Sequence, residues 1–168
     1  MNHGWPPLGL HLNDAGGDFW GYVDKCYQLY YDTVHVQPRP WPVPGQSLNI
    51  KRQPVDEKGR CNTFWHLVTE GEIEDERTPS TSRLERVGWP MALISEFNDI
   101  YPAAQSSRIR WWKTKRGAEE RYAIALEDFS YVVIVADRKT YCLLWTAYPV
   151  EYESRRRKLR REFEEFWK

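Results

Sequence analysis

The strongest constraint in this sequence is a stretch in which strand-like runs follow one another with almost nothing between them. The runs are Arg108–Lys115, Arg121–Leu126, Tyr131–Ala136 and Tyr141–Tyr148. Connections this short join only antiparallel neighbours, so the stretch predicts a β-meander. The unbroken apolar run Val132–Val135 is typical of a central strand that is covered on both faces.

Helical spacing appears near both ends of the chain. Phe19, Val23, Cys26 and Tyr30 recur at helical spacing within 18–34, which predicts an N-terminal helix. Residues 151–168 place Leu159, Phe163, Phe166 and Trp167 on one face behind a run of bases at 155–161, which predicts a basic amphipathic helix. We expect these two helices to cover the faces of the sheet.

The segments between the first helix and the meander are less regular. Alternating prolines at 38–44 predict an extended arm, with Trp41 packed against the body. Period-two patterns at 47–52 and 63–70, with a turn at 56–59, predict a hairpin. Residues 71–86 are polar and charged and favour no regular structure, whereas Pro90–Asn98 predicts a short helix.

These elements predict an α+β fold: an N-terminal helix and extended arm, a mainly antiparallel meander of about four to five strands, and a C-terminal basic amphipathic helix. The length of 168 residues favours a single domain. Within it we expect an N-terminal part (1–60), a sheet core (61–150) and the last helix (151–168). Three widely spaced cysteines and no leader-like or membrane-spanning run indicate a cytoplasmic protein without membrane contact.

Charge is balanced overall but uneven along the chain. Lysine plus arginine number 24, as do aspartate plus glutamate, so net charge predicts no general attraction to nucleic acid. Acids concentrate at 70–76, and bases at 108–116 and 155–161. These runs are either partner-binding surfaces or solvated faces and internal ion pairs.

Two short segments offer groups for catalysis. In a strand at 63–70, His66 and Glu70 would share a face roughly 13 Å apart, and His66 is the natural proton-transfer group. Arg83 and Arg86 would lie on one side of a helical turn, where they would bind phosphate or simply neutralise the acids at 70–76. In the final strand, Thr146 and Tyr148 would present two hydroxyls together, for a phosphate or for nearby backbone groups.

A basic and aromatic surface is the other candidate feature. The segment 108–116 mixes five bases with two tryptophans, a composition suited to phosphate contact and base stacking, although either tryptophan could belong to the core. The RNA-binding residues that we predict are Arg108, Arg110, Trp112, Lys113, Lys115, Arg155 and Arg156. The histidines are too scattered for a metal site, and no nucleotide-binding or hydrolase motif is present, so we expect no metal and no cofactor.

The order helix, arm and meander, closing on Lys139–Val150, resembles the barnase, EndoU, colicin and RelE group of small ribonucleases, and most of all its phage-associated branch. The likeness lies in the Tyr-Val-Val-Ile-Val run at 131–135 and the Thr-Ala-Tyr run at 146–148, and covers about 64–150. It implies RNA cleavage without a metal, with His66 as general acid or base, Glu70 as a possible second proton carrier, and Arg83, Arg86, Thr146 and Tyr148 around the phosphate.

The resemblance therefore predicts an endoribonuclease, a toxin or defence effector that cuts transfer or ribosome-associated RNA and has an antitoxin or inhibitor as partner. Two alternatives stay open. One is a nucleic-acid-binding module without catalysis, which would use Trp111, Trp112 and the basic last helix. The other is a protein-binding inhibitor, for which the acidic stretch 70–76 would be the contact.

Overall fold

The computed structural model describes residues 4–168 and divides the chain into two compact units. The first contains the described residues up to Pro38 together with Lys51–Ala92, and the second contains Arg39–Ile50 and Leu93–Lys168. The predicted single domain stays a prediction, and each unit is described by itself. Over residues 4–168, every helix is too short or too polar to span a bilayer.

The second unit is built on a five-stranded sheet of order β1-β7-β6-β5-β4. Its strands are β1 (Leu48–Asn49), β4 (Ile109–Arg116), β5 (Glu119–Leu126), β6 (Tyr131–Asp137) and β7 (Cys142–Pro149). The last four form the predicted antiparallel meander with β6 at the centre, so the α+β fold and the meander are confirmed. The short strand β1 pairs with β7 in parallel.

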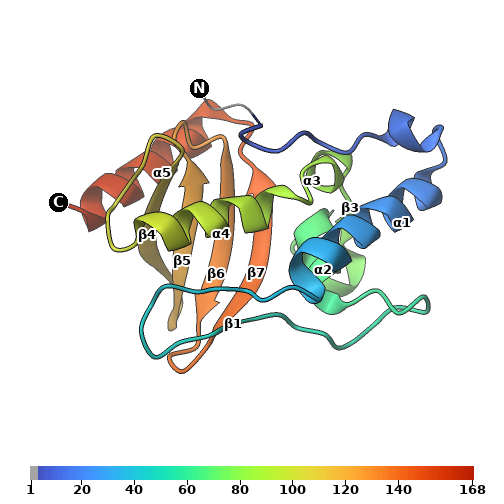
Figure 1. Cartoon of the computed structure of the whole chain (residues 1–168). Coiled ribbons are helices and arrows are strands. Elements are labelled where there is room, and N and C mark those ends of the chain that lie inside the picture. Colours follow the sequence, from blue (N-terminus) through green and yellow to red (C-terminus); the bar gives the residue numbers. More distant parts are fainter. Residues whose placement is uncertain (1–3) are drawn as a thin grey trace. The chain divides into compact units, whose positions relative to one another are not determined.

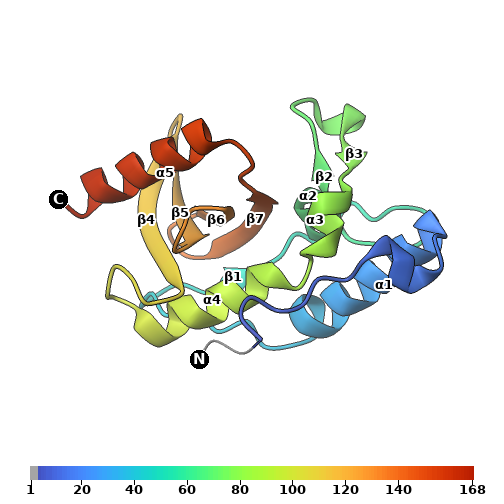
Figure 2. The same ribbon diagram turned by 90° about the horizontal axis from the view of Figure 1, so that it is seen from above.

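Two helices cover the sheet on opposite sides (Figures 1 and 2). Helix α5 (Glu153–Phe166), the predicted basic helix, inserts Leu159 among Trp112, Val132 and Ile134. On the other face lies α4 (Trp89–Ile100), the predicted short helix, whose Phe97 ring contacts Trp111 and Tyr122. The second cover is thus α4 and not the N-terminal helix, which belongs to the first unit.

A β-bulge changes which side chains share a face of β7. Val135 pairs with Leu144 but Ile134 pairs with Thr146, so Trp145 is an extra residue in the ladder. A bulge shifts the alternation beyond it by one residue. Cys142 and Leu144 therefore lie on the sheet face opposite to Thr146 and Tyr148, and these last two share one face as predicted.

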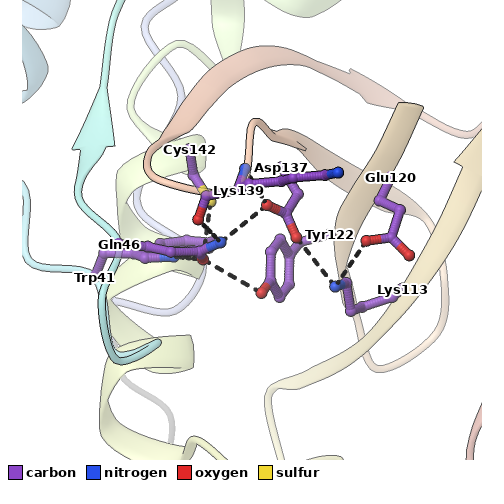
Figure 3. Close-up of polar contacts among 8 residues, drawn as sticks. All are labelled: Trp41, Gln46, Lys113, Glu120, Tyr122, Asp137, Lys139 and Cys142. Atoms are coloured by element: carbon purple, nitrogen blue, oxygen red, sulfur yellow. Dashed lines mark hydrogen bonds and ion pairs between the residues drawn. The ribbon is translucent and has the colours of Figure 1, made fainter. Parts of the chain in front are cut away.

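The arm before β1 is fixed to the sheet by a polar network (Figure 3). Gln46 donates to the Asp137 carboxylate over 2.9 Å and to the Lys139 carbonyl over 3.0 Å, and its own amide oxygen accepts from Trp41 over 3.3 Å. The Trp41 ring also contacts Tyr122, as expected for an arm that packs on the body.

Asp137 is the anion at the centre of this network. Its side chain is 7% exposed and lies 3.1 Å from the Lys113 ammonium. Burial alone would raise the pKa of Asp137, but hydrogen bonds from the Lys139 N–H, Lys113 and Gln46 outweigh it and hold the pKa below its usual value.

We therefore expect Asp137→Asn to lower the free energy of unfolding by about 1–3 kcal/mol at pH 7, because Lys113 loses its nearest carboxylate. The folded-state pKa of Asp137 is depressed, so its contribution is present above an unfolded-state pKa of about 3.9 and disappears as the pH falls through the folded-state pKa. Urea denaturation from pH 3 to 7 tests this. The difference between wild type and variant should shrink below about pH 4, while the exposed Asp99→Asn control stays within about 0.5 kcal/mol at neutral pH.

The first unit is mainly helical. It contains α1 (Phe19–Tyr30), which continues into a π-helical turn (Tyr31–His35), then α2 (Asn62–Val68) and α3 (Thr81–Glu85). A 3-10 turn (Leu12–Ala15) precedes α1. Between α2 and α3 lie β2 (Thr69–Glu70), a 3-10 turn (Glu74–Glu76) and β3 (Thr78–Pro79), and the two short strands pair antiparallel. The predicted N-terminal helix is confirmed, and the segment expected to be irregular contains short regular elements.

The predicted hairpin of 47–52 and 63–70 is wrong, because most of the second segment is helix α2. Thr63, Phe64, His66, Leu67 and Val68 are all buried and the other two residues of α2 are partly buried, so this helix has no exposed face, as is typical of a helix within a core. Aromatic and β-branched residues favour strands only weakly, and burial against neighbours overrides that preference. The Phe64 ring packs edge-on against Tyr27 of α1, with centroids 4.9 Å apart.

Candidate functional site

The first unit contains a hollow of about 300 Å³ beside α2. Its lining residues are Trp20, Trp65, His66, Thr69, Glu74, Arg77 and Pro79. The hollow therefore combines two indole rings with a histidine, a carboxylate and a guanidinium. Its volume is at the lower end of the range of ligand pockets, roughly 300–1,000 Å³.

His66 and Glu74 form the acid–base pair of the hollow. Nε2 of His66 lies 2.8 Å from Oε1 of Glu74, and the histidine side chain is 9% exposed whereas that of Glu74 is 63% exposed. Burial lowers the pKa of His66 below its usual value, as do the charges of Arg77 and Lys51, whereas the Glu74 carboxylate partly opposes them. The imidazole is therefore mainly neutral at pH 7, the state that accepts a proton.

Arg77 fixes the chain around this pair. Its guanidinium donates to the backbone carbonyls of Thr69 (2.5 Å), Gly71 (2.8 Å) and His66 (3.4 Å), and to the Thr69 hydroxyl (3.0 Å). The last carbonyls of a helix have no partner within the helix, so a cation at the end of α2 satisfies them. Arg77 thus ties the segment that carries Glu74 to the end of the helix that carries His66.

The predicted catalytic residues of the first unit do not all meet at the hollow. They are His66, Glu70, Arg83 and Arg86. Glu70 is exposed on β2 and is not the partner of His66; the carboxylate beside the imidazole is Glu74. Arg83 approaches the hollow, since its Nη1 donates to the Thr69 carbonyl over 2.6 Å. Arg86 instead donates to the Ser82 carbonyl over 2.7 Å, pairs with Glu85 at 3.5 Å and lies over the Trp89 ring.

The other two predicted catalytic residues, Thr146 and Tyr148, belong to the second unit. Both lie half-buried on β7, on the sheet face that carries α5. The Tyr148 hydroxyl accepts a hydrogen bond from Arg155 over 3.4 Å. Their predicted role beside a phosphate stays a prediction.

The basic strand β4 does not form the predicted stacking surface. Trp112 is fully buried and its indole donates to Glu162 over 3.3 Å, so its assignment to RNA binding is wrong, and Trp111 is only 5% exposed. Alternation along the strand also separates Arg110 from Lys113 and Lys115, which lie on the opposite face.

Most of the remaining predicted RNA-binding residues have partners within the second unit. Arg108 lies 3.7 Å from Glu96, and Arg110 donates to the Ser106 carbonyl over 2.6 Å. Lys113 lies between Asp137 and Glu120. On α5, Arg156 donates to the Val150 carbonyl over 2.8 Å, and Arg155 is exposed but donates to the Tyr148 hydroxyl over 3.4 Å. Lys115 is exposed at the end of β4.

Of the residues that line the hollow, the sequence reasoning placed only His66 in the site; it missed Trp20, Trp65, Thr69, Glu74, Arg77 and Pro79. Glu74 was hidden in the run of acids at 70–76, where nothing distinguishes one carboxylate from the next. The available signal was the position of Arg77 directly after that run, because one base among acids often marks an internal contact. Trp20 lies next to the apolar positions that predict α1 and is 56% exposed, so helical spacing gave no signal for it.

Within residues 4–168 there is no cluster of three or more histidine, cysteine, aspartate or glutamate side chains suited to a metal ion. His3, one of the histidines considered in the sequence, lies outside the described residues. Comparison with known proteins finds no matching family model, no similar curated protein and no similar solved structure.

Removing the Arg77 guanidinium tests its part in the site. We expect Arg77→Ala to lower the free energy of unfolding by about 1–3 kcal/mol, because the partly buried carbonyls of His66 and Thr69 at the end of α2 lose a charged donor. Urea denaturation followed by circular dichroism measures the change. Arg52→Ala is the matched control, an exposed arginine of the same unit, and equal stabilities of the two variants would contradict the proposed role.

Proposed function

We propose that this chain is a metal-independent endoribonuclease and that His66 is its proton-transfer residue. The observation that carries the proposal is the pairing of a buried imidazole with Glu74 at 2.8 Å in the wall of an aromatic hollow. A histidine held by a carboxylate is a common arrangement for general acid–base catalysis. RNA cleavage is also the activity that the resemblance to small ribonucleases implies.

In the proposed reaction, His66 takes the proton of a ribose 2′-hydroxyl, and the resulting oxygen attacks the adjacent phosphorus. The bond from phosphorus to the 5′-oxygen breaks, and that oxygen takes up a proton from water as it leaves, while the protonated imidazole returns its proton to the solvent. The products are a 2′,3′-cyclic phosphate and a 5′-hydroxyl end. Arg83, which approaches the hollow through Thr69, is the proposed stabiliser of the charged transition state, and Glu74 orients the imidazole.

The acidic run near the hollow restricts how RNA would bind. Glu72, Asp75 and Glu76 are exposed on the segment that also carries Glu74, and they repel a phosphate backbone. We therefore assign only the reacting ribose and phosphate to the neighbourhood of His66 and Arg83. As a toxin or defence effector, the protein would act on transfer or ribosome-associated RNA, again as the resemblance implies.

The exposed bases of α5 favour a second candidate function, RNA binding without cleavage. Arg157, Lys158 and Arg161 are exposed on this helix, and a row of such cations suits a phosphate backbone. The two candidates differ in their dependence on His66. RNA binding without cleavage requires the bases of α5 and does not depend on the imidazole of His66.

Replacing His66 tests the catalytic proposal. Wild-type protein incubated with total RNA and EDTA should produce 2′,3′-cyclic phosphate ends, and His66→Ala should reduce the rate by roughly 10²–10⁴-fold. His11→Ala is the matched control, because His11 also lies beside a carboxylate, 3.5 Å from Glu85, but on the surface. RNA that stays intact with wild-type protein, or cleavage that requires a metal, would refute the proposal.

The pH dependence tests the role of Glu74. If neutral His66 is the base, the acid limb of kcat/KM should have its midpoint below pH 6.5, because burial depresses the pKa of the imidazole in the free protein. Glu74→Gln removes the one neighbouring charge that raises this pKa, so the limb should move to lower pH. A limb that does not move, measured from pH 4 to 8, would mean that Glu74 does not tune the histidine.

A further inference from the structure

Trp20 is a large aromatic side chain that is exposed to solvent. It lies in the first turn of α1, lines the hollow beside His66, and is 56% exposed. Its ring contacts Phe19 edge-on, with centroids 5.3 Å apart. More than half of the accessible surface of this residue therefore stays open to solvent beside the hollow.

A buried arginine fixes the two indoles of the hollow. Arg60 is 5% exposed, and its guanidinium carbon lies 5.8 Å from the Trp20 ring centroid and 5.7 Å from that of Trp65. Its nitrogens pair with Asp24 at 2.6 Å and with Asp56 at 3.1 Å. Asp56 also accepts from the Trp65 indole over 3.0 Å.

This arrangement orders the aromatic wall before any ligand arrives. Both carboxylates hold Arg60 in one position, and the guanidinium then contacts both rings, a favourable cation–π geometry. Preorganised rings lose little conformational freedom when a ligand stacks on them. The wall is therefore suited to a flat ligand.

From these contacts we infer that Trp20 and Trp65 form a stacking subsite for a nucleobase of single-stranded RNA, next to the ribose that faces His66. The inference rests on the proposed function and specifies that the hollow binds the nucleobase of the substrate. A base is neutral and planar, so it meets the indoles without the repulsion that a phosphate would meet at Glu74. Stacking tolerates every base, so the subsite selects unpaired RNA and not a sequence.

Binding of an uncleavable RNA tests the subsite separately from catalysis. The probe is a fluorescently labelled, fully 2′-O-methylated octanucleotide of mixed sequence, and a second probe of the same length has abasic sugars throughout. Fluorescence anisotropy with the full chain measures both affinities. We expect Trp20→Leu to weaken binding of the first probe by roughly 5- to 150-fold and to leave the abasic probe unchanged.

Two further variants keep the test decisive. Trp20→Phe retains an aromatic ring and should recover most of the lost affinity, which a general folding defect would not allow. Tyr152→Leu removes a 75% exposed aromatic of the second unit and should bind both probes as wild type does. Circular dichroism confirms that each variant is folded.

The outcomes separate this inference from the proposed function. Equal affinity of wild type and Trp20→Leu for the first probe overturns the subsite, even if wild-type protein cuts RNA. Equal loss for both probes also overturns it, because the effect would not depend on the base. Base-dependent binding through Trp20 together with intact RNA would support the subsite and refute the nuclease.

Discussion

The candidate site depends on one guanidinium group that joins the end of a helix to a loop. Arg77 donates to the carbonyls of His66 and Thr69 at the end of α2 and to that of Gly71 beyond it. Arg83 also donates to the Thr69 carbonyl, and Arg77 extends this anchoring to the Gly71 carbonyl of the loop, since the last turn of a helix has no further N–H groups to offer. The distance between His66 and Glu74 is therefore set by backbone anchoring, and the pairing of the two side chains follows from it.

The sheet could be predicted because the features that determine it lie close together in the sequence. Short connections allow only antiparallel pairing, and the apolar run in β6 identifies a central strand, so the meander follows from a few residues. Of its two covering helices only α5 was expected in that place, because the N-terminal helix belongs to the other unit. The bulge at Trp145 was not predictable, because a single extra residue leaves the apolar pattern on both sides intact. Such a shift is decided by how β7 fits β6 and not by its own sequence.

The site was predicted less well, because its geometry depends on contacts between distant segments. Reading 63–70 as a strand placed His66 and Glu70 on one face, whereas helix α2 ends at Val68 and the chain returns to bring Glu74 to the imidazole. His66 could be selected from the sequence alone, because a histidine titrates near neutral pH and therefore suits proton transfer. Its partner Glu74 and the contact of Trp20 with Arg60 could not be predicted from the sequence, because both depend on how distant segments pack together.

The charge pattern of the sequence also misleads, because contacts between distant segments decide which charges stay exposed. The bases of β4 look like an RNA-binding strand, yet Arg108 and Lys113 neutralise acids of their own unit. The reversed charge order of α5, with acids near its C-terminal end, has a comparable internal cause, because Glu162 accepts from the buried Trp112 indole. A buried donor without an acceptor costs about 1–3 kcal/mol, more than the ~0.3–1 kcal/mol of an unfavourable end charge. Glu162 therefore serves the core of the unit and does not belong to the exposed charge of the helix.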